Sequence, residues 1–534
     1  MKNRNKGITL IALVVSIIVL LVLAGVSISM LTGQNGILRR TVEAKERTDE
    51  AKEKEMLQRV ILGAIATAPY GKLEKEELQQ QLKNEGEDVE VIDEEENFNV
   101  IFKKSKRSYY VEKNGKISAS EGMINDNNAG DITKGGVLNG LDKPYEINCI
   151  EDLVALSNMV NGTGIIIENG KPKEVEKNYI FTGKKIVLKR NLDFNSDFSY
   201  QNSQRTDFGD INGITDDGNI LIKELTTGKG FNPIGQYGTE FQGDFDGINN
   251  KILNLYEKDV DGRMGLFGCI KNSSIKNLYV KGKIENNTDN IVGGLSGSAH
   301  SSNIDIINCI VNININSKSS VNGGFFGNTW GGKISFTNCG NHGDINVGAG
   351  TAGGFIGSME STTDIYNSYN LGNIKLSDNG NISGLSGMVG TIFSNNLNVI
   401  NSFNAGNIES KRNGRRGGIV GNGERITNYL KLEHVYNLGM ITGELPNWST
   451  GKGALLGYGA DITNAAITIN ECYYIQGTAD TAVYKKDDSE YGVKKIEELR
   501  YHELVQKLNY FVENGNRSDW KLWKIGNYEY PVFE

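Results

Sequence analysis

Few residues of the chain combine the types and spacings that chemistry requires. The four histidines are His300, His342, His434 and His502. His502 and Glu503 open a stretch that ends in Gln506, at the place where a zinc-binding His-Glu-x-x-His helix carries its second histidine. Because that second nitrogen ligand is missing, we expect no metal site here and no cofactor in the protein.

Two groups of charged residues are weaker candidates. Asp244 and Asp246 flank Phe245, and paired carboxylates are the groups that a glycosidase uses. The same Asp-x-Asp-Gly pattern is typical of a turn, which we favour. Residues 411–416 form a basic loop that could contact an anionic glycan but is more often a solvated loop. The sequence names no catalytic residue, and we predict that the protein is not an enzyme.

Charge and cysteine content exclude further classes of protein. The formal net charge is −8, so a nucleic-acid partner has no electrostatic support. The five cysteines are odd in number and lack a Cys-x-x-Cys spacing, which excludes a disulfide framework and a zinc ribbon. The 66 glycines beside only 6 prolines indicate many tight turns.

A short repeat, two glycines around two mostly apolar residues, dominates the chain between about residue 230 and residue 475. Its successive final glycines are 29, 30, 30, 30, 34 and 36 residues apart. A fixed period of this length is typical of a solenoid. We expect these glycines at corners or at close approaches between coils; they are Gly268, Gly297, Gly327, Gly357, Gly387, Gly421 and Gly457.

The second half of each repeat has the period of a strand. Residues 307, 309, 311, 313 and 315 are apolar, while residues 308, 312 and 314 are asparagine. The pattern predicts a mainly β fold, a right-handed parallel β-helix whose coils stack about 4.8 Å apart. Cys309 and Cys339 share one register and are read as small inward-facing hydrophobic groups. One structural position, where stacked side chains can hydrogen-bond along a ladder, is shared by Asn308, Asn338, Asn367 and Asn401.

These repeats resemble the GLUG motif of bacterial surface proteins over about 250 residues. That motif occurs in adhesins and in some immunoglobulin-cleaving metallopeptidases. The resemblance implies an architecture and gives little indication of activity.

The first residues carry a separate signal. Lys2, Arg4 and Lys6 precede an uncharged run from Ile8 to Leu31, which as a helix would span about 36 Å and cross a bilayer. The basic flank places the N-terminus inside the cell.

The sequence around Gly7 and Ile8 resembles a type IV prepilin leader. The resemblance implies that a prepilin peptidase cleaves after Gly7 and methylates Ile8, while the helix remains as an anchor able to meet other pilin-like subunits. Ala12 stands where that family usually has Glu, which makes incorporation into a pilus doubtful. An uncleaved single-pass anchor and an ordinary signal peptide stay open as alternatives.

The sequence therefore predicts a membrane-anchored bacterial cell-surface protein, with most of the chain outside the cell and an adhesin-like β-helix that binds or has a structural role. A surface glycan or a protein is the expected ligand. A minor pilin or pseudopilin subunit and a carbohydrate-active β-helix enzyme are the alternatives. The predicted parts are a leader and transmembrane pilin-like helix (1–34), an extended helix (35–70), a small α+β stalk domain (71–118), a linker (119–145), an N-terminal solenoid cap (146–230), the repeats (231–475) and a C-terminal cap (476–534).

Overall fold

The computed structural model describes residues 52–534 outside a set of short segments. Gly7, Ile8 and the predicted transmembrane helix lie outside the described residues. Among the helices that are described, none combines the length and the apolar character needed to cross a bilayer. The chain divides into two compact units, residues 1–123 and 124–534. Besides 1–51, the residues left undescribed are 54, 62, 66–72, 94–96, 105–106, 114–116, 120–135, 139–140, 169–170, 196–227, 378–379, 412–413, 424, 427–428, 444–450, 459–465, 498–500, 515–519 and 527–529.

The first unit is a small α+β domain. Its antiparallel sheet follows chain order, and α3 (Lys75–Asn84) buries Leu78 and Leu82 in the same core as the sheet. The helical residues Leu57 and Ile61 belong to that core as well, so the end of the predicted extended helix is part of the domain. The strands are β1 (Val89–Asp93), β2 (Asn97–Phe102), β3 (Arg107–Glu112) and β4 (Ile117–Ala119).

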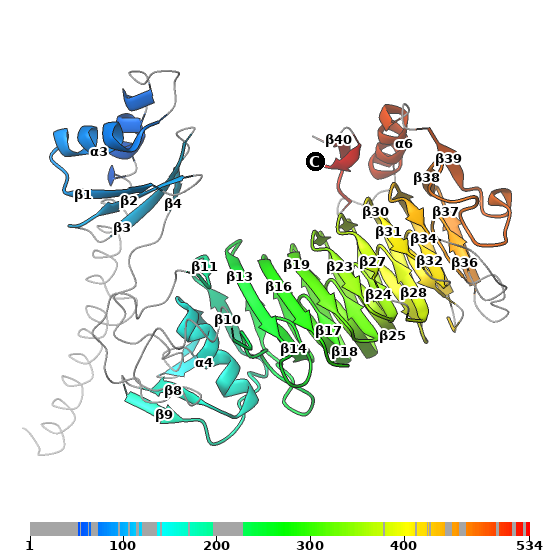
Figure 1. Cartoon of the computed structure of the whole chain (residues 1–534), viewed down its shortest axis with the longest axis horizontal. Helices are drawn as coiled ribbons and strands as arrows, with labels where there is room; N and C mark the ends of the chain where they lie inside the picture. The colour runs from blue at the N-terminus through cyan, green and yellow to red at the C-terminus, as the bar shows by residue number, and fades with distance from the viewer. Residues whose placement is uncertain are drawn as a thin grey trace, which may run out of the picture. The chain divides into compact units, whose positions relative to one another are not determined.

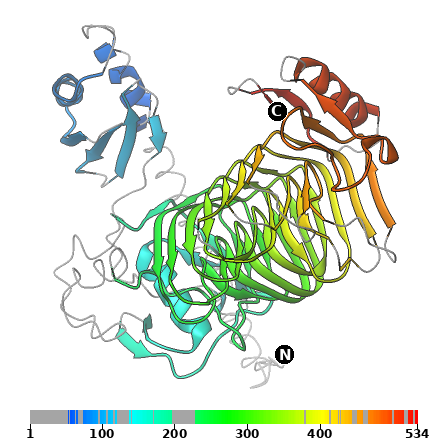
Figure 2. The same cartoon turned by 45° about the vertical axis from the view of Figure 1, so that its right-hand side comes forward.

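The second unit is a parallel β-solenoid, which confirms the mainly β part of the predicted fold class; its right-handed sense and the N-terminal transmembrane helix stay predictions. Figures 1 and 2 show its coils stacked side by side. Each coil places strands on three faces, and each strand pairs in parallel with its equivalent in the next coil.

The first face continues from coil to coil through parallel pairs such as Ile306 with Phe336. Its strands are β7 (Tyr145–Ile147), β10 (Lys185–Leu188), β12 (Asp244–Asp246), β15 (Ser274–Lys276), β18 (Ser296–Ile307), β21 (Phe326–Thr337), β25 (Ile356–Tyr366), β30 (Leu397–Asn404), β34 (Tyr429–Asn437) and β37 (Ala466–Asn470). The first residues of β18, β21 and β25 form a further edge with β14 (Phe267–Ile270), β29 (Val389–Ile392) and β33 (Val420–Asn422).

Two further faces complete each coil. The second contains β11 (Leu192–Asp193), β13 (Lys251–Lys258), β16 (Tyr279–Asn286), β19 (Ile310–Ser317), β22 (Gly340–Asn341), β23 (Ile345–Val347), β26 (Tyr369–Asn370), β27 (Ile374–Leu376), β31 (Ile408–Ser410), β35 (Ile441–Thr442), β38 (Tyr473–Ile475) and β39 (Lys494–Ile496). The third is a six-stranded sheet of β17 (Val292–Gly293), β20 (Val321–Gly323), β24 (Gly350–Gly353), β28 (Ile382–Ser386), β32 (Arg415–Gly417) and β36 (Gly451–Gly453).

The chain turns from the first face to the second at a residue with a left-handed backbone. Asn308 has φ 54° and Asn338 has φ 57°, a conformation that asparagine tolerates better than most residues. The side chains form a ladder: Nδ2 of Asn338 donates to Oδ1 of Asn308 at 3.0 Å. Asn401 donates to Asn367 in the same way at 2.8 Å, and His434 occupies this position one coil later with φ 52°.

The residue after each corner points into the solenoid. Cys309 and Cys339 are buried there, in the same core as the aliphatic side chains of the coils. Burial raises the pKa of the Cys309 thiol to about 12, so the thiol stays protonated and unreactive near neutral pH. All five cysteines are free and buried.

Glycines form two columns where neighbouring backbones meet. In the first, a Cβ on Gly357 would lie 2.3 Å from the carbonyl oxygen of Asn322. The parallel pairing of Ile356 with Val389 aligns Gly357 with Gly390, which differs from the predicted equivalence of Gly357 and Gly387. Gly268, Gly297, Gly327, Gly421 and Gly457 are also close approaches, with a neighbouring atom at 2.1–2.7 Å from a Cβ.

Gly387 lies in the second column, because the coil between residues 357 and 390 is three residues longer than the one before it. A Cβ on Gly387 would lie 2.2 Å from Cγ of the buried Asn404. Gly354 and Gly418 have the same relation to Asn370 and Asn437. This column leaves room for a row of buried amides.

Replacing Gly357 by alanine is expected to destabilise the solenoid strongly, by about 3 kcal/mol or more, because the new methyl group meets the backbone of the preceding coil. Gly423→Ala is the matched control, since its nearest neighbour is the flexible end of Ile426 at 3.0 Å. Thermal unfolding of the two variants measures the difference. Equal midpoints would show that the coils move apart easily.

Each end of the solenoid is covered. At the start, α4 (Ile150–Asn161) hydrogen-bonds the first coil through Ser157 Oγ and the carbonyl oxygen of Asn232, at 2.6 Å. At the far end lie η4 (Asp488–Glu490), α6 (Tyr501–Asn514) and the hairpin of β40 (Trp523–Ile525) and β41 (Pro531–Phe533) (Figure 1). Two further hairpins are β5 (Gly136–Leu138) with β6 (Leu141–Lys143), and β8 (Ile165–Glu168) with β9 (Lys171–Glu174).

The C-terminal hairpin lies over an aromatic column. Tyr369, Phe403 and Tyr436 stack in successive coils with centroids 5.2 and 5.0 Å apart. Trp523 covers Phe403 and Tyr436, and its indole N–H donates to Oδ1 of Asn401 at 2.8 Å. The backbone N–H of Lys521 donates to Oδ1 of Asn367. A second small core therefore joins the end of the chain to coils formed more than 100 residues earlier.

Candidate functional site

An exposed aromatic cluster on the solenoid surface is the strongest candidate for a binding site. It consists of Tyr237, His300 and Trp330. The centroid of the His300 ring lies 5.4 Å from that of Tyr237 and 6.0 Å from that of Trp330, both with edge-to-face geometry. Tyr237 is 67% exposed and Trp330 53% exposed, whereas His300 is buried between them.

The three rings come from different coils. His300 in β18 and Trp330 in β21 are direct partners in the parallel pairing, and the next residue in the same row is Glu360 of β25. Tyr237 lies on a turn that precedes β12, which Thr239 Oγ1 closes by accepting the backbone N–H of Gln236 at 3.1 Å. The solenoid register therefore positions two of the rings and a hydrogen-bonded turn positions the third.

Polar groups lie directly beside the rings. Nδ1 of His300 is 3.4 Å from Oε1 of Glu240. Burial alone would raise the pKa of Glu240, but hydrogen bonds from the backbone N–H groups of Glu240 and Gly238 and from His300 lower it. Burial lowers the pKa of His300 in spite of Glu240. Near neutral pH a neutral imidazole therefore donates a hydrogen bond to an ionised carboxylate.

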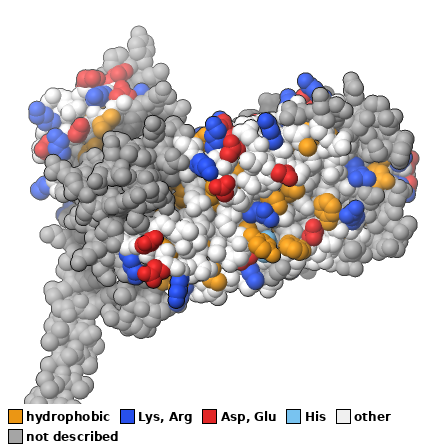
Figure 3. Space-filling view, turned by 60° about the horizontal axis from the view of Figure 1, so that its bottom comes forward, with side chains coloured by type: hydrophobic (Ala, Val, Ile, Leu, Met, Phe, Trp, Pro, Cys, Tyr) orange, Lys and Arg blue, Asp and Glu red, His pale blue; other side chains and the backbone are white. Residues whose placement is uncertain are grey.

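A second row of polar groups runs alongside the rings. Ser298, Asn328 and Ser358 are partners in the parallel pairing. Arg263 donates from Nε to Oγ of Ser298 at 3.0 Å, and its backbone is hydrogen-bonded to the side chain of Gln236. Figure 3 shows a face of the molecule on which hydrophobic side chains gather beside a histidine, with acidic and basic side chains around them.

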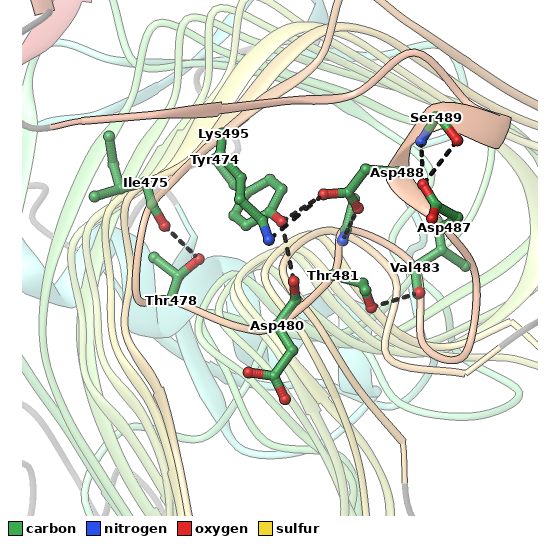
Figure 4. A network of polar contacts seen from close by, with 11 residues as sticks. Tyr474, Ile475, Thr478, Asp480, Thr481, Val483, Asp487, Asp488, Ser489 and Lys495 are labelled. Carbon is green, nitrogen blue, oxygen red and sulfur yellow. Dashed lines mark hydrogen bonds and ion pairs between the residues drawn. The ribbon is translucent and has the colours of Figure 1, made fainter.

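The polar network at the end of the solenoid has a different role. Asp488 accepts hydrogen bonds from the Tyr474 hydroxyl at 2.6 Å and from the backbone N–H of Ala482 at 2.7 Å, and Lys495 lies 4.0 Å away (Figure 4). Burial and the Asp488 carboxylate raise the pKa of Tyr474 well above its ordinary value. These contacts join β38, η4 and β39, so the network holds the cap together.

The charged residues singled out from the sequence are built into the fold. Phe245 points inward between Asp244 and Asp246, and Oδ1 of Asp246 accepts the backbone N–H of Ile248 at 3.0 Å, as a turn requires. Arg416 is fully buried in β32 and donates to the carbonyl oxygen of Thr442 at 3.1 Å. Arg415 lies over the ring of Tyr458 at 4.5 Å. This part of the basic stretch 411–416 therefore belongs to a sheet, because its residues pair with Gly451 and Lys452.

His502 and Glu503 lie exposed in the first turn of α6. The described residues contain no group of three or more histidine, cysteine, aspartate or glutamate side chains arranged to hold a metal ion.

The comparisons with known proteins bear on the fold. No protein-family model matches the chain, and no curated protein matches it. Among solved structures, the chain is similar to one named IgA1 Protease, with 14% sequence identity and a TM-score of 0.37. The match covers 73% of this chain, and the chain spans only 25% of the length of that protein.

This comparison requires one correction. The prediction that the protein is not an enzyme rested on the lack of a recognisable catalytic residue in the sequence. The matched structure is named a protease, which contradicts this prediction. At 14% identity and a TM-score of 0.37 the likeness assigns no activity to this chain.

Proposed function

We propose that the chain is a surface-displayed β-helix protein that binds a ligand through Tyr237, His300 and Trp330. The observation that carries the proposal is the exposure of Trp330 and Tyr237 on a solenoid whose other large aromatic side chains are mostly buried. Tryptophan and tyrosine are the residues that most often dominate binding energy, and clustered exposed apolar groups mark interaction sites.

The positioning of the rings supports the same proposal. His300 is fixed between its neighbours and bonded to Glu240, so the cluster is organised before any ligand arrives. A pre-organised surface loses less conformational entropy on binding. An adhesin-like role would use such a surface on the outside of the cell.

The Tyr237→Ala/Trp330→Ala variant of the full chain is expected to reduce attachment of cells that display it about tenfold or more. Attachment is counted on surfaces coated with polysaccharides or with proteins. Tyr510→Ala is the matched control, because Tyr510 is 61% exposed on α6, in a different part of the fold. An unchanged attachment of the double variant would overturn the proposal.

We also propose that the leader is processed after Gly7 and that the helix tethers the protein to the membrane. The packing of helical residues Leu57 and Ile61 in the core of the first unit supports a helix that enters this domain from the N-terminal side. Mass spectrometry of the membrane-extracted protein is expected to find a methylated Ile8 at the N-terminus. An intact Met1 or a terminus at Gly25 would contradict prepilin-type processing and leave the binding proposal unaffected.

A further inference from the structure

We propose that the ligand of the aromatic cluster is an uncharged polysaccharide chain that lies along the stacking direction of the coils. This inference rests on the proposed binding function and specifies its ligand. The exposed rings offer flat apolar surfaces, while hydrogen-bonding groups surround them. A sugar ring has the complementary character, with apolar C–H faces and hydroxyl groups at its edge.

The shape of the cluster favours a chain over a single sugar. His300 and Trp330 are equivalent residues of neighbouring coils, and the turn with Tyr237 lies against the coil before them, where Gly235 accepts the backbone N–H of Cys269. Neighbouring coils are about 4.8 Å apart. The rings therefore follow one another in the direction in which the coils stack, and an elongated ligand contacts both exposed rings at once.

The charges around the cluster favour an uncharged ligand. Glu240 lies on one side of His300, and Glu360 follows Trp330 in the next coil. Arg263 lies across the row at Ser298. Burial is the main cause that lowers the pKa of His300, and the nearby cations Arg263 and Lys271 lower it further. An anionic polymer would be repelled by the two glutamates, and a cationic ligand by Arg263 and Lys271.

Partly exposed polar side chains surround the rings and can meet the hydroxyl groups of such a chain; they are Glu240, Arg263, Lys271 and Glu360. Ser298, Asn328 and Ser358 form an uncharged row two residues before His300, Trp330 and Glu360 along the strands. Ser298 and Ser358 are buried, so this row lies beneath the surface that the ligand would contact.

The test is calorimetric titration of the detergent-extracted full chain with uncharged hexasaccharides derived from cellulose, chitin, mannan and galactan. We expect at least one to bind, with its disaccharide about tenfold weaker or more because the disaccharide cannot reach both rings. Trp330→Ala is expected to weaken the hexasaccharide about tenfold or more, Trp330→Phe by only about threefold, and Tyr510→Ala not at all.

The alternative outcomes separate this inference from the proposed function. Binding of polygalacturonate without any of the uncharged hexasaccharides would overturn the ligand class. The ligand class is also overturned if no hexasaccharide binds and protease treatment of the target surface abolishes the cell attachment that depends on Trp330. That result would indicate a protein ligand. If neither titration nor attachment depends on Trp330, the inference and the proposed binding surface both fail. Equal thermal unfolding of Trp330→Ala and the parent chain excludes misfolding as the cause.

Discussion

Replacing Glu257 by glutamine is expected to remove most of the pH dependence of solenoid stability between about pH 5 and pH 8. Glu257 points into the solenoid from β13 and is fully buried. The backbone N–H of Gly265 donates to its Oε2 at 2.9 Å, and its Oε1 has no hydrogen-bond partner among the described residues. Burial raises the pKa of this carboxyl from 4.5 to about 8.

The direction of the effect follows from the raised pKa. The folded protein holds the proton on Glu257 at a pH where the unfolded chain has lost it. The contribution of Glu257 to the free energy of unfolding is therefore fully present below about pH 4.5. It is lost as the pH rises toward 8, by roughly 5 kcal/mol in total. Glutamine is uncharged at every pH, so the variant is expected to be more stable than the parent chain at pH 8 and similar at pH 5.

Calorimetric unfolding of both proteins at pH 5 and pH 8 measures this difference in the midpoint of the solenoid transition. Glu285→Gln is a matched control from the neighbouring coil. The ion pair with Lys283 lowers the pKa of Glu285, so its contribution is lost only as the pH falls through the acid range. A parent solenoid with the same midpoint at pH 5 and pH 8 would contradict the prediction.

Replacing Asn404 by alanine is expected to destabilise the solenoid by about 4 kcal/mol. Asn404 is fully buried in a row of amides. Asn370 donates to its Oδ1 at 2.7 Å, and its Nδ2 donates to Asn437 at 2.7 Å and to the carbonyl oxygen of Gly406 at 2.9 Å. Alanine would leave these buried partners unsatisfied and open a cavity, and both effects are costly.

Two further variants test how the loss of stability depends on burial and on the number of hydrogen bonds. Asn341 begins the row and lacks a donor to its Oδ1 among the described residues, so Asn341→Ala is expected to cost less than Asn404→Ala. Asn373 belongs to an exposed row in which water can replace the lost contacts with Asp344 and Asn407, so Asn373→Ala is expected to cost about 1 kcal/mol or less. Chemical denaturation measures the free energy of unfolding of each variant and so gives the order of the losses. Equal losses of unfolding free energy in Asn404→Ala and Asn373→Ala would show that the buried row contributes no more to stability than the exposed row.

The fold was predictable because a parallel solenoid places equivalent residues on top of one another. Asn308 and Asn338 occupy the same position in successive coils, and asparagine at this position indicates a corner with a left-handed backbone. Gly387 was misaligned for a physical reason: the coil after Gly357 contains an insertion, and Gly384-Leu-Ser-Gly387 has the same pattern as the true repeat. Only the pairing of Ile356 with Val389 identifies Gly390 as the equivalent residue.

The buried amide row was missed although the sequence carries its signal. Asn341, Asn370, Asn404 and Asn437 each precede a glycine by two residues, and each amide donates to the carbonyl oxygen of that glycine. Only the corner asparagines were expected to form a ladder from the sequence; they are Asn308, Asn338, Asn367 and Asn401. Whether an asparagine faces the interior depends on a shift of one residue along the strand.

The aromatic cluster was predictable only in part. His300 and Trp330 are separated by 30 residues, one full period, so the repeat alone indicates that they are neighbours. Tyr237 comes from a turn outside the regular repeat, and its approach to His300 depends on how that turn packs on the first coils. The exposure of a single aromatic residue is also invisible in the sequence, because buried aromatic residues recur at many similar positions.

The covered aromatic column has a consequence for biosynthesis. The ribosome produces Tyr369, Phe403 and Tyr436 well before the residues of β40 and β41 that shield them. A nascent solenoid therefore displays a stacked aromatic strip, and such surfaces attract other unfolded chains or chaperones. We therefore expect that the yield of folded protein depends on preventing contacts of this strip during translation, until the hairpin has been made and covers it.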